Sequence, residues 1–292
     1  MIIGCTGNYR KSDYIDIVTH INDFLSKKNI RCIVSSDLYN SNDITKPEID
    51  DNFEVLDFTD IEELCDVILC VGGDGTFLST ARRLTNINIP LLGIHIGGLG
   101  FLAEVAKDNI EQSLECLLNG NYNIEKRMRI ELSLKDSKQS KHFVALNDIV
   151  VDHGTSGRIL KTKIDVDEDY LNTYESDGMI ISTSIGSTAY SLSAGGPIVH
   201  PSMDTIIITP ICPHSLSARS IVLSGEKSIS IEFPDLYDGI SCTIDGQERF
   251  LIGDSSRLEI QKSSKSIKII MLTLYNYFET LRNKMRWSGN LR

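Results

Sequence analysis

The chain has 292 residues, of which 41% are hydrophobic, and its 29 basic and 40 acidic side chains give a net charge of −11. This length and composition predict a globular protein of two domains. The acidic balance argues against nucleic acid as a partner, because that contact needs clustered lysine and arginine. No apolar run has the length of a membrane span, so we expect no membrane partner either.

The N-terminus and the cysteines predict the compartment. The chain starts with a strand-like Met1-Ile2-Ile3-Gly4 rather than a signal peptide. Its seven cysteines are scattered, mostly within apolar runs, and no C-x-x-C occurs. We therefore expect free buried thiols in a reducing cytoplasm and no metal site, since the six histidines are also dispersed.

Strand and helix patterns alternate over residues 1–120 and predict an α/β domain with a parallel, doubly wound sheet. The expected strands are residues 1–4, 30–34, 66–71 and 90–96, and the expected helices are residues 12–28, 77–84 and 109–118. Residues 35–60 are polar and acidic, and we expect a mobile loop there.

A strand, a glycine turn and a helix meet at Val71-Gly72-Gly73-Asp74-Gly75-Thr76. Amides at a helix N-terminus can face a phosphate, and glycine lets a ligand approach the backbone. The candidate phosphate- or ATP-binding residues are Gly72, Gly73, Gly75 and Thr76. Asp74 repels phosphate, so we expect it to hold Mg²⁺ or to take a proton from an attacking hydroxyl, two roles of phosphoryl transfer. The alternative is a helix cap.

Other phosphate and hydrolase motifs are weak or absent. Gly98-Leu99-Gly100-Phe101-Leu102-Ala103 fits G-x-G-x-x-A, but no acidic residue follows at the spacing of an ordinary dinucleotide fold. We expect a tight interdomain turn there. Neither G-x-x-x-x-G-K-[ST] nor G-x-S-x-G occurs, which disfavours P-loop enzymes and nucleophile-elbow hydrolases.

Short strand-like runs dominate residues 121–272 and predict a β-rich, sandwich-like second domain. The expected strands are residues 129–134, 143–151, 160–166, 179–183, 205–209, 228–233, 241–244, 258–261 and 266–272. Asp245-Gly246 predicts a hairpin. The tail, residues 273–292, has a helical pattern and is a candidate for packing on the first domain.

Polar residues that could hold a ligand gather in the second domain. Between Asp177 and Pro197 a strand runs into Gly186, followed by small residues and hydroxyls that let a ligand lie against the backbone. Tyr190 offers a flat face for a base, and the alternative is a capped, tightly packed helix. Asn147-Asp148 could hold two ribose hydroxyls or form a strand-end turn. Arg158 could contact a phosphate or be a surface charge.

Together these segments resemble the NAD kinase (ATP-NAD kinase) family. GGDGT alone is also found in lipid kinases and phosphofructokinases, whereas the long block ending in Gly-Gly-Pro is specific. The matching segments are Gly72-Gly73-Asp74-Gly75-Thr76, Gly97-Gly98-Leu99-Gly100-Phe101-Leu102, Leu146-Asn147-Asp148, Asp177-Gly178, Gly186-Ser187-Thr188-Ala189-Tyr190-Ser191-Leu192-Ser193-Ala194-Gly195-Gly196-Pro197, Cys212-Pro213-His214-Ser215-Leu216-Ser217 and Asp245-Gly246-Gln247.

The resemblance implies an enzyme that transfers the γ-phosphoryl of ATP to the 2′-hydroxyl of the adenosine ribose of NAD, giving NADP. It implies Mg²⁺ with ATP, a site between the two domains and a homodimer or homotetramer. Asp74 would be the base. The NAD-binding residues would be Asp74, Gly75, Asn147, Asp148, Arg158, Asp177, Thr188, Ala189, Tyr190, Ser191, Ser193 and Gln247. The rival hypotheses are a lipid or sphingoid-base kinase and a non-catalytic NAD(H) sensor.

Some positions depart from the family pattern. Ser184-Ile185 stands where Pro-Thr is frequent, Asn147-Asp148 where Asn-Glu is also common, and Asp152-His153-Gly154 where an Arg often precedes the Gly. Glu175 stands where a basic or neutral residue is frequent. None of these departures involves Asp74.

Overall fold

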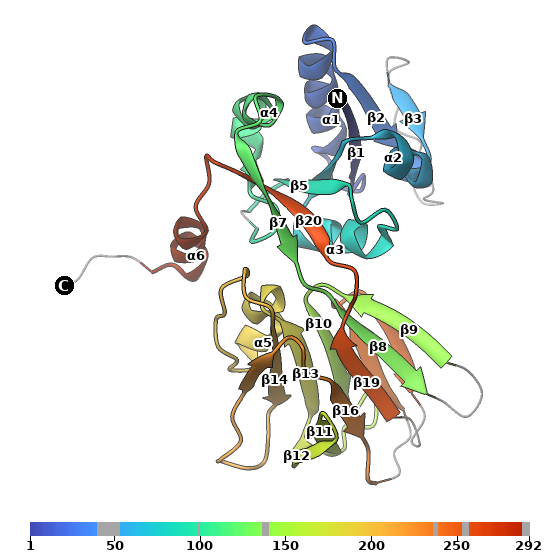
Figure 1. The fold of residues 1–292 in the computed structure, drawn as a ribbon, viewed down its shortest axis with the longest axis vertical. Helices are drawn as coiled ribbons and strands as arrows, with labels where there is room; N and C mark the ends of the chain where they lie inside the picture. Colours follow the sequence, from blue (N-terminus) through green and yellow to red (C-terminus); the bar gives the residue numbers. More distant parts are fainter. Residues whose placement is uncertain (40–52, 99, 136–139, 236–238, 253–256, 288–292) are drawn as a thin grey trace, which may run out of the picture. The chain divides into compact units, whose positions relative to one another are not determined.

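The computed structural model describes residues 1–39, 53–98, 100–135, 140–235, 239–252 and 257–287 (Figure 1). The chain divides into two compact units. Unit 1 comprises Met1–Glu125 and Ile267–Arg292, and unit 2 comprises Lys126–Ser266. Unit 2 is therefore inserted into unit 1, and the chain changes unit at 125/126 and 266/267 rather than at the expected 120/121 and 272/273.

Unit 1 contains the predicted parallel sheet. Its order is β3-β2-β1-β4-β5-β20-β7, with β6 paired to β5, and the pairs from β3 to β20 are parallel. The strands are β1 (Ile2–Gly7), β2 (Arg31–Ser35), β3 (Glu54–Leu56), β4 (Val67–Gly72), β5 (Pro90–His95), β6 (Val105–Ala106), β7 (Tyr122–Arg127) and β20 (Ile267–Leu272). The strand order reverses between β1 and β4, which is where ligands bind in open α/β sheets.

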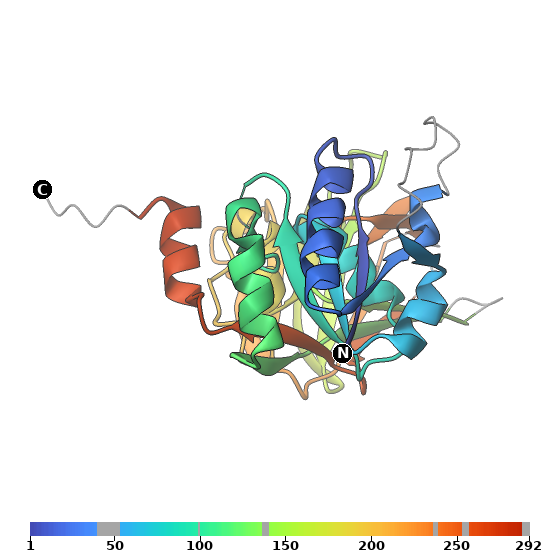
Figure 2. The same ribbon diagram turned by 90° about the horizontal axis from the view of Figure 1, so that it is seen from above.

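Helices cover both faces of this sheet, as a doubly wound fold requires. The helical segments are α1 (Tyr14–Lys27), η1 (Ser36–Tyr39), α2 (Phe58–Leu64), α3 (Asp74–Arg83), η2 (Lys107–Asn109), α4 (Ile110–Leu118) and α6 (Tyr277–Met285). Helices α1 and α4 lie side by side (Figure 2) and share a core with Ile3 and Cys5 of β1. Gly4, between those two residues, faces Ile61 of α2 on the opposite side.

Residues 35–60, where a mobile loop is expected, form regular elements at their described ends. Residues 36–39 form η1, Glu54–Leu56 form the edge strand β3, and α2 begins at Phe58. Phe58 and Ile61 are buried, because α2 packs these two side chains against the rest of unit 1. Residues 40–52 of the expected loop lie outside the described residues.

Unit 2 consists of antiparallel sheets, as predicted. One described sheet has the order β15-β14-β13-β10-β17-β18 and another the order β12-β11-β16-β19-β8-β9. Alternate side chains of both, such as Ile149, Ile181, Ile231 and Ile260, share one core. The strands are β8 (Ile130–Lys135), β9 (Ser140–Ala145), β10 (Asp148–Asp152), β11 (Leu160–Val166), β12 (Asp169–Ser176), β13 (Gly178–Thr183), β14 (Thr205–Ile211), β15 (Ile221–Ser224), β16 (Ile229–Glu232), β17 (Ile240–Ile244), β18 (Glu248–Ile252) and β19 (Arg257–Lys262).

Two strand predictions in this region need correction. The single strand expected over residues 143–151 is two strands, β9 and β10, which belong to different sheets. Residues 266–272 were expected in the β-rich domain, but β20 pairs with β5 in unit 1, where Ile269 lies opposite Leu91. The predicted hairpin is confirmed, since Asp245 and Gly246 join β17 to β18 with positive φ angles of 49° and 66°.

All seven cysteines are free thiols, as expected. Six are buried, but Cys212 is exposed, because it follows the end of β14 in a left-handed conformation with φ 45°. No helix among the described residues combines the length and the apolar character needed to cross a membrane.

Candidate active site

The carboxylate of Asp74 is fixed by backbone N–H groups from a distant loop. Asp74 is the first residue of α3 and follows the turn after β4. Phe101 N–H donates to Oδ2 at 2.9 Å, and the N–H groups of Leu102 and Ala103 donate to Oδ1 at 3.0 and 3.2 Å. We call these three donors the Asp74 cradle. Gly73 rather than Asp74 is the N-cap of α3, so the helix-cap alternative is wrong.

The cradle lies on the loop that joins β5 to β6. These strands are parallel neighbours, with His95 opposite Ala106, so both ends of the loop are held in the unit 1 sheet. The returning backbone passes directly over Gly93, where a Cβ would lie 2.6 Å from Cα of Ala103. The interdomain turn expected at residues 98–103 is therefore wrong: the segment is an excursion within unit 1 that supplies donors to Asp74. Leu99 of this motif lies outside the described residues.

The four candidate phosphate residues surround the start of α3. Thr76 Oγ1 accepts the N–H of Gly73 at 3.4 Å, and the N–H of Thr76 donates to the carbonyl of Gly73 at 3.0 Å. The carbonyl of Gly72 accepts the N–H of Ile96 at 2.7 Å, which ties the ends of β4 and β5 together. Gly75 is exposed at the helix N-terminus, where the helix dipole favours an anion.

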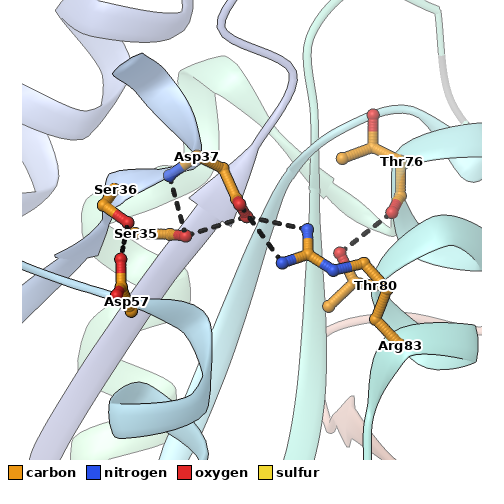
Figure 3. A network of polar contacts seen from close by, with 7 residues as sticks. All are labelled: Ser35, Ser36, Asp37, Asp57, Thr76, Thr80 and Arg83. Carbon is orange, nitrogen blue, oxygen red and sulfur yellow. Dashed lines mark hydrogen bonds and ion pairs between the residues drawn. The ribbon is translucent and has the colours of Figure 1, made fainter. Parts of the chain in front are cut away.

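The other end of α3 is anchored by polar contacts of Arg83 with Asp37 (Figure 3) and by a contact of Arg83 with an aromatic ring. Arg83 donates from two guanidinium nitrogens to the two oxygens of Asp37, at 2.7 and 3.2 Å. Asp37 also accepts from Ser35 Oγ at 2.9 Å, and the guanidinium lies 4.4 Å from the ring centroid of Phe58. Because the paired contact fixes orientation as well as position, it holds the helix that begins with Asp74.

Unit 2 contains a pocket of about 300 Å³. Side chains on one face of β10 and the end of β17 form part of its lining, and Ala189 and Tyr190 of the helical segment after β13 contribute another part. That segment comprises η3 (Ile185–Thr188) and α5 (Tyr190–Ser193). The lining residues are Asn147, Asp148, Val150, Asp152, Ala189, Tyr190, Thr243, Asp245 and Gly246. Pockets of this size take small ligands.

In unit 2, the carboxylate of Asp245 is held by backbone N–H groups in the same way as that of Asp74 in unit 1. Asp245 accepts the N–H groups of Leu146, Asn147 and Asp148 at 2.8 to 3.2 Å. These bonds bend the backbone between β9 and β10, which explains why the expected single strand is two strands. The same bonds turn the Asn147-Asp148 pair into the pocket.

Asp148 and Asn147 place buried polar atoms at this pocket. Asp148 is 4% exposed, and its burial, together with the charge of Asp245, raises the pKa of the Asp148 carboxyl to about 7. Oδ1 of Asn147 is buried without a hydrogen-bond partner in the described structure. Buried polar groups are normally paired, so the unpaired Oδ1 of Asn147 points to a ligand with hydroxyl or amide donors.

The remaining predicted residues of unit 2 differ in whether they line the pocket. Tyr190 lines the pocket with 47% of its surface exposed, which leaves its ring available for stacking. Asp177 and Thr188 are partly buried, and Arg158, Ser193 and Gln247 are exposed, but none of them lines the pocket. Ser191 is fully buried, and its Oγ lies 2.9 Å from Oγ1 of Thr209. Ser191 therefore supports the fold of this segment rather than the pocket surface.

Sequence reasoning missed five pocket residues, which are Val150, Asp152, Thr243, Asp245 and Gly246. Asp152 alternates with Asp148 along β10, so period-two spacing could have placed both on one face. Thr243 lies opposite Val150 in the neighbouring strand. Asp245 was interpreted only as a turn residue, and no local signal reveals that its carboxylate holds residues 146–148.

Family models match both parts of the chain. Residues 3–122 match the ATP-NAD kinase N-terminal domain, and residues 146–272 match the ATP-NAD kinase C-terminal domain. The chain belongs to the ATP-NAD kinase family. The NAD kinase of Geotalea daltonii is 40% identical over 229 residues, covering 78% of this chain and 81% of the relative. The NAD kinase of Clostridium beijerinckii is 41% identical over 239 residues, covering 80% and 84%.

Solved structures of this family have the same fold. The yeast NADH kinase complexed with NADH superposes with a TM-score of 0.87 and 26% identity, covering all of this chain and 89% of the yeast chain. The NAD kinase from Archaeoglobus fulgidus, in complex with ATP, has a TM-score of 0.76 at 24% identity, covering 99% and 100%, and supports the fold alone. The ATP-NAD kinase fold of this chain therefore extends over both units.

Proposed function

We propose that this chain transfers the γ-phosphoryl of ATP to the 2′-hydroxyl of the adenosine ribose of NAD, giving NADP, with Asp74 as the general base. Membership of the ATP-NAD kinase family supports the reaction. The Asp74 cradle supports the role of the base and is the observation that carries it.

The distribution of the cradle bonds suits a proton acceptor. A ribose hydroxyl attacks poorly until a base takes its proton, and such a base contributes about 10²–10⁴ in rate. Oδ1 of Asp74 accepts two N–H groups, whereas Oδ2 accepts one and keeps a further lone pair for a hydroxyl.

The unit 2 pocket is the proposed site for a nucleoside part of NAD. Asn147 and Asp148 offer acceptors to a ribose diol, and Tyr190 offers a ring on which a base can stack. Ala189 adds an apolar wall. Further proposed contacts to NAD, carried over from the family resemblance, are Gly75, Arg158, Asp177, Thr188, Ser193 and Gln247.

The start of α3 is the proposed phosphate site for ATP, because the helix dipole favours anions there. Among the described residues, no three His, Cys, Asp or Glu side chains gather as a metal site. The lone pair that the cradle leaves on Oδ2 of Asp74 is the one proposed to take the ribose proton, so Asp74 is not proposed as a metal ligand. Mg²⁺ is therefore proposed to enter as part of the ATP substrate, in keeping with its preference for phosphate oxygens.

A coupled assay for NADP tests the reaction and the base together. The substrates are NAD and ATP with Mg²⁺, and the variants are Asp74→Asn and the control Asp23→Asn, which changes an exposed carboxylate on α1. We expect turnover in the wild type and control, and loss of turnover with retained NAD binding in Asp74→Asn. Wild-type protein that binds NAD but makes no NADP would support a sensor. Asp74→Asn with most of its kcat would exclude the base role.

We also propose that the enzyme works in the cytoplasm as a homodimer or homotetramer. Seven free cysteines are in keeping with a reducing compartment. Exposed apolar side chains, including Leu216 at 95% and Leu251 at 69% exposure, are candidates for subunit contacts. Light scattering coupled to size exclusion gives the mass, and a monomer at working concentration would contradict this assembly.

A further inference from the structure

His95 is a buried histidine next to the cradle that the proposed reaction does not yet use. It is the last residue of β5 and lies opposite Gly72, the last residue of β4. Its side chain is only 6% exposed. The loop that carries the Asp74 cradle leaves the sheet directly after His95 and returns beside it at Ala106.

The hydrogen bond of His95 fixes its tautomer. Nδ1 lies 2.8 Å from the carbonyl oxygen of Gly97. A carbonyl oxygen only accepts, so Nδ1 carries the proton. Nε2 is buried and has no partner in the described structure. Burial lowers the pKa of His95 and outweighs the opposing effect of the bond to the Gly97 carbonyl, which favours a neutral ring.

The accepting residue, Gly97, begins the excursion that ends at the cradle. Gly97 has a left-handed φ of 103°, so the chain turns sharply there. Lys11 Nζ holds the preceding carbonyl, that of Ile96, at 3.0 Å. Consecutive carbonyls at 96 and 97 are thus both fixed by side chains before the chain reaches residues 101–103. An apolar side chain at position 95 would leave no buried polar atom, whereas His95 leaves its Nε2 without a partner. The bond from Nδ1 to the Gly97 carbonyl is therefore the feature that accounts for a histidine here.

We propose that His95 is a positioning residue for phosphoryl transfer. By holding the carbonyl of Gly97, its Nδ1–H sets the path of the loop, so that the N–H groups of Phe101, Leu102 and Ala103 keep the Asp74 carboxylate aimed at the substrate hydroxyl. This inference rests on the proposed role of Asp74 as base. It assigns His95 no contact with NAD or ATP.

Two amide substitutions distinguish the role of Nδ1 from that of Nε2. In His95→Asn the side-chain N–H stands near the place of Nδ1, whereas in His95→Gln it stands near the place of Nε2. We expect His95→Ala and His95→Gln to lose about 10- to 100-fold in kcat, the range that slight misplacement of a catalytic group costs, with the KM for NAD within about threefold. His95→Asn should keep kcat within about threefold of the wild type.

The control is His20→Ala, which removes an exposed histidine of α1 in the same unit. It should leave kcat unchanged. His95→Ala with wild-type kcat would overturn the proposal. So would His95→Gln as active as His95→Asn, because the bond at Nδ1 would then not matter. If His95→Ala fails to fold, the comparison of Asn with Gln, with matched thermal melts, decides the question alone.

A double variant separates this proposal from that for Asp74. In an Asp74→Asn background, His95→Ala should cause little further loss of the residual rate, because His95 acts through Asp74. Independent, multiplying losses would overturn the positioning role and leave the base role standing. Full turnover of Asp74→Asn would instead remove the base role itself.

Discussion

A Cβ on residue 100 would lie well under 3.0 Å from Oδ1 of Asp74, closer than Cβ atoms come to other atoms. Only glycine at position 100 leaves the carboxylate in its cradle. Gly100 is the second glycine of the G-x-G-x-x-A match. It therefore makes room for the Asp74 side chain rather than for a pyrophosphate. It couples the GGDGT turn to the loop after β5.

Gly100→Ala should displace the Asp74 carboxylate and lower kcat by about 100-fold, since a shift of about 1 Å in a catalytic group has that cost. The matched control is Gly98→Ala, because a Cβ on residue 98 meets nothing within 4 Å. Steady-state kinetics on both variants checks this. Equal kcat values would mean that the carboxylate tolerates displacement.

NAD binding should depend on the ionisation of Asp148. Its pKa of about 7 leaves only about a tenth of the free protein ionised at pH 6 and about nine tenths at pH 8. A ribose diol needs the ionised carboxylate as acceptor, so the Kd for NAD should be about tenfold weaker at pH 6 than at pH 8. Calorimetry in buffers of different ionisation enthalpy should detect proton release. A Kd that is flat with pH would contradict the contact.

The same carboxylate should oppose folding at neutral pH. Its folded pKa is raised above the unfolded value, so the folded state holds the proton between about pH 4 and pH 7, and stability falls as pH rises through this window. Asp148→Asn should therefore raise the free energy of unfolding at pH 8, by up to about 4 kcal/mol, with little change at pH 4. Urea titrations at both pH values check this, and destabilisation at pH 8 would contradict it.

Asp245→Asn should affect the pocket in two ways. The amide keeps one oxygen for the N–H groups of residues 146–148 but loses the other acceptor, which should weaken NAD binding. It also removes the negative charge that helps raise the pKa of Asp148, so the pH midpoint of NAD binding should move to lower pH. The shift should be partial, because burial is the larger cause. A midpoint that stays in place would show that the two carboxylates are not coupled.

Thiol labelling should distinguish Cys212 from the other six cysteines. Cys212 is exposed and the others are buried. A soluble aromatic disulfide reagent should modify one thiol quickly in the native protein and seven in denaturant, and Cys212→Ser should abolish the fast phase. Fast labelling of several thiols would show that the core opens readily.

Local patterns were sufficient where each element carries its own signal. Val67–Gly72 and Asp74–Arg83 form the predicted strand and helix around GGDGT, because a buried apolar run, glycines and a helical pattern follow in order. The strand at Pro90–His95 and the parallel sheet were predicted for the same reason. Edge strands such as β3 and β12 were missed, since their half-exposed residues give a weaker pattern.

The parts of the site that could not be predicted depend on contacts between distant residues. The cradle joins Asp74 to residues 27 to 29 positions later, and Asp245 holds residues 97 to 99 positions earlier. Both aspartates precede a glycine, so each looks locally like a turn residue. The strand, glycine turn and helix around GGDGT made Asp74 a candidate, and the resemblance implied that it is the base. Nothing local to Gly100, Asp245 or His95 indicates which side chain or carbonyl it serves.

The insertion of unit 2 between β7 and β20 sets an order of events on the ribosome. Because synthesis runs from the N-terminus, the whole of Lys126–Ser266 is made before Ile267–Leu272, the strand that completes the unit 1 sheet beside β5. Unit 2 can therefore fold as a unit while the edge of β5 at Pro90 and Leu91 is still unpaired. Premature termination anywhere after residue 266 and before β20 is finished would release a chain with a complete second unit and an unpaired, apolar strand edge, which is a target for chaperones and proteases.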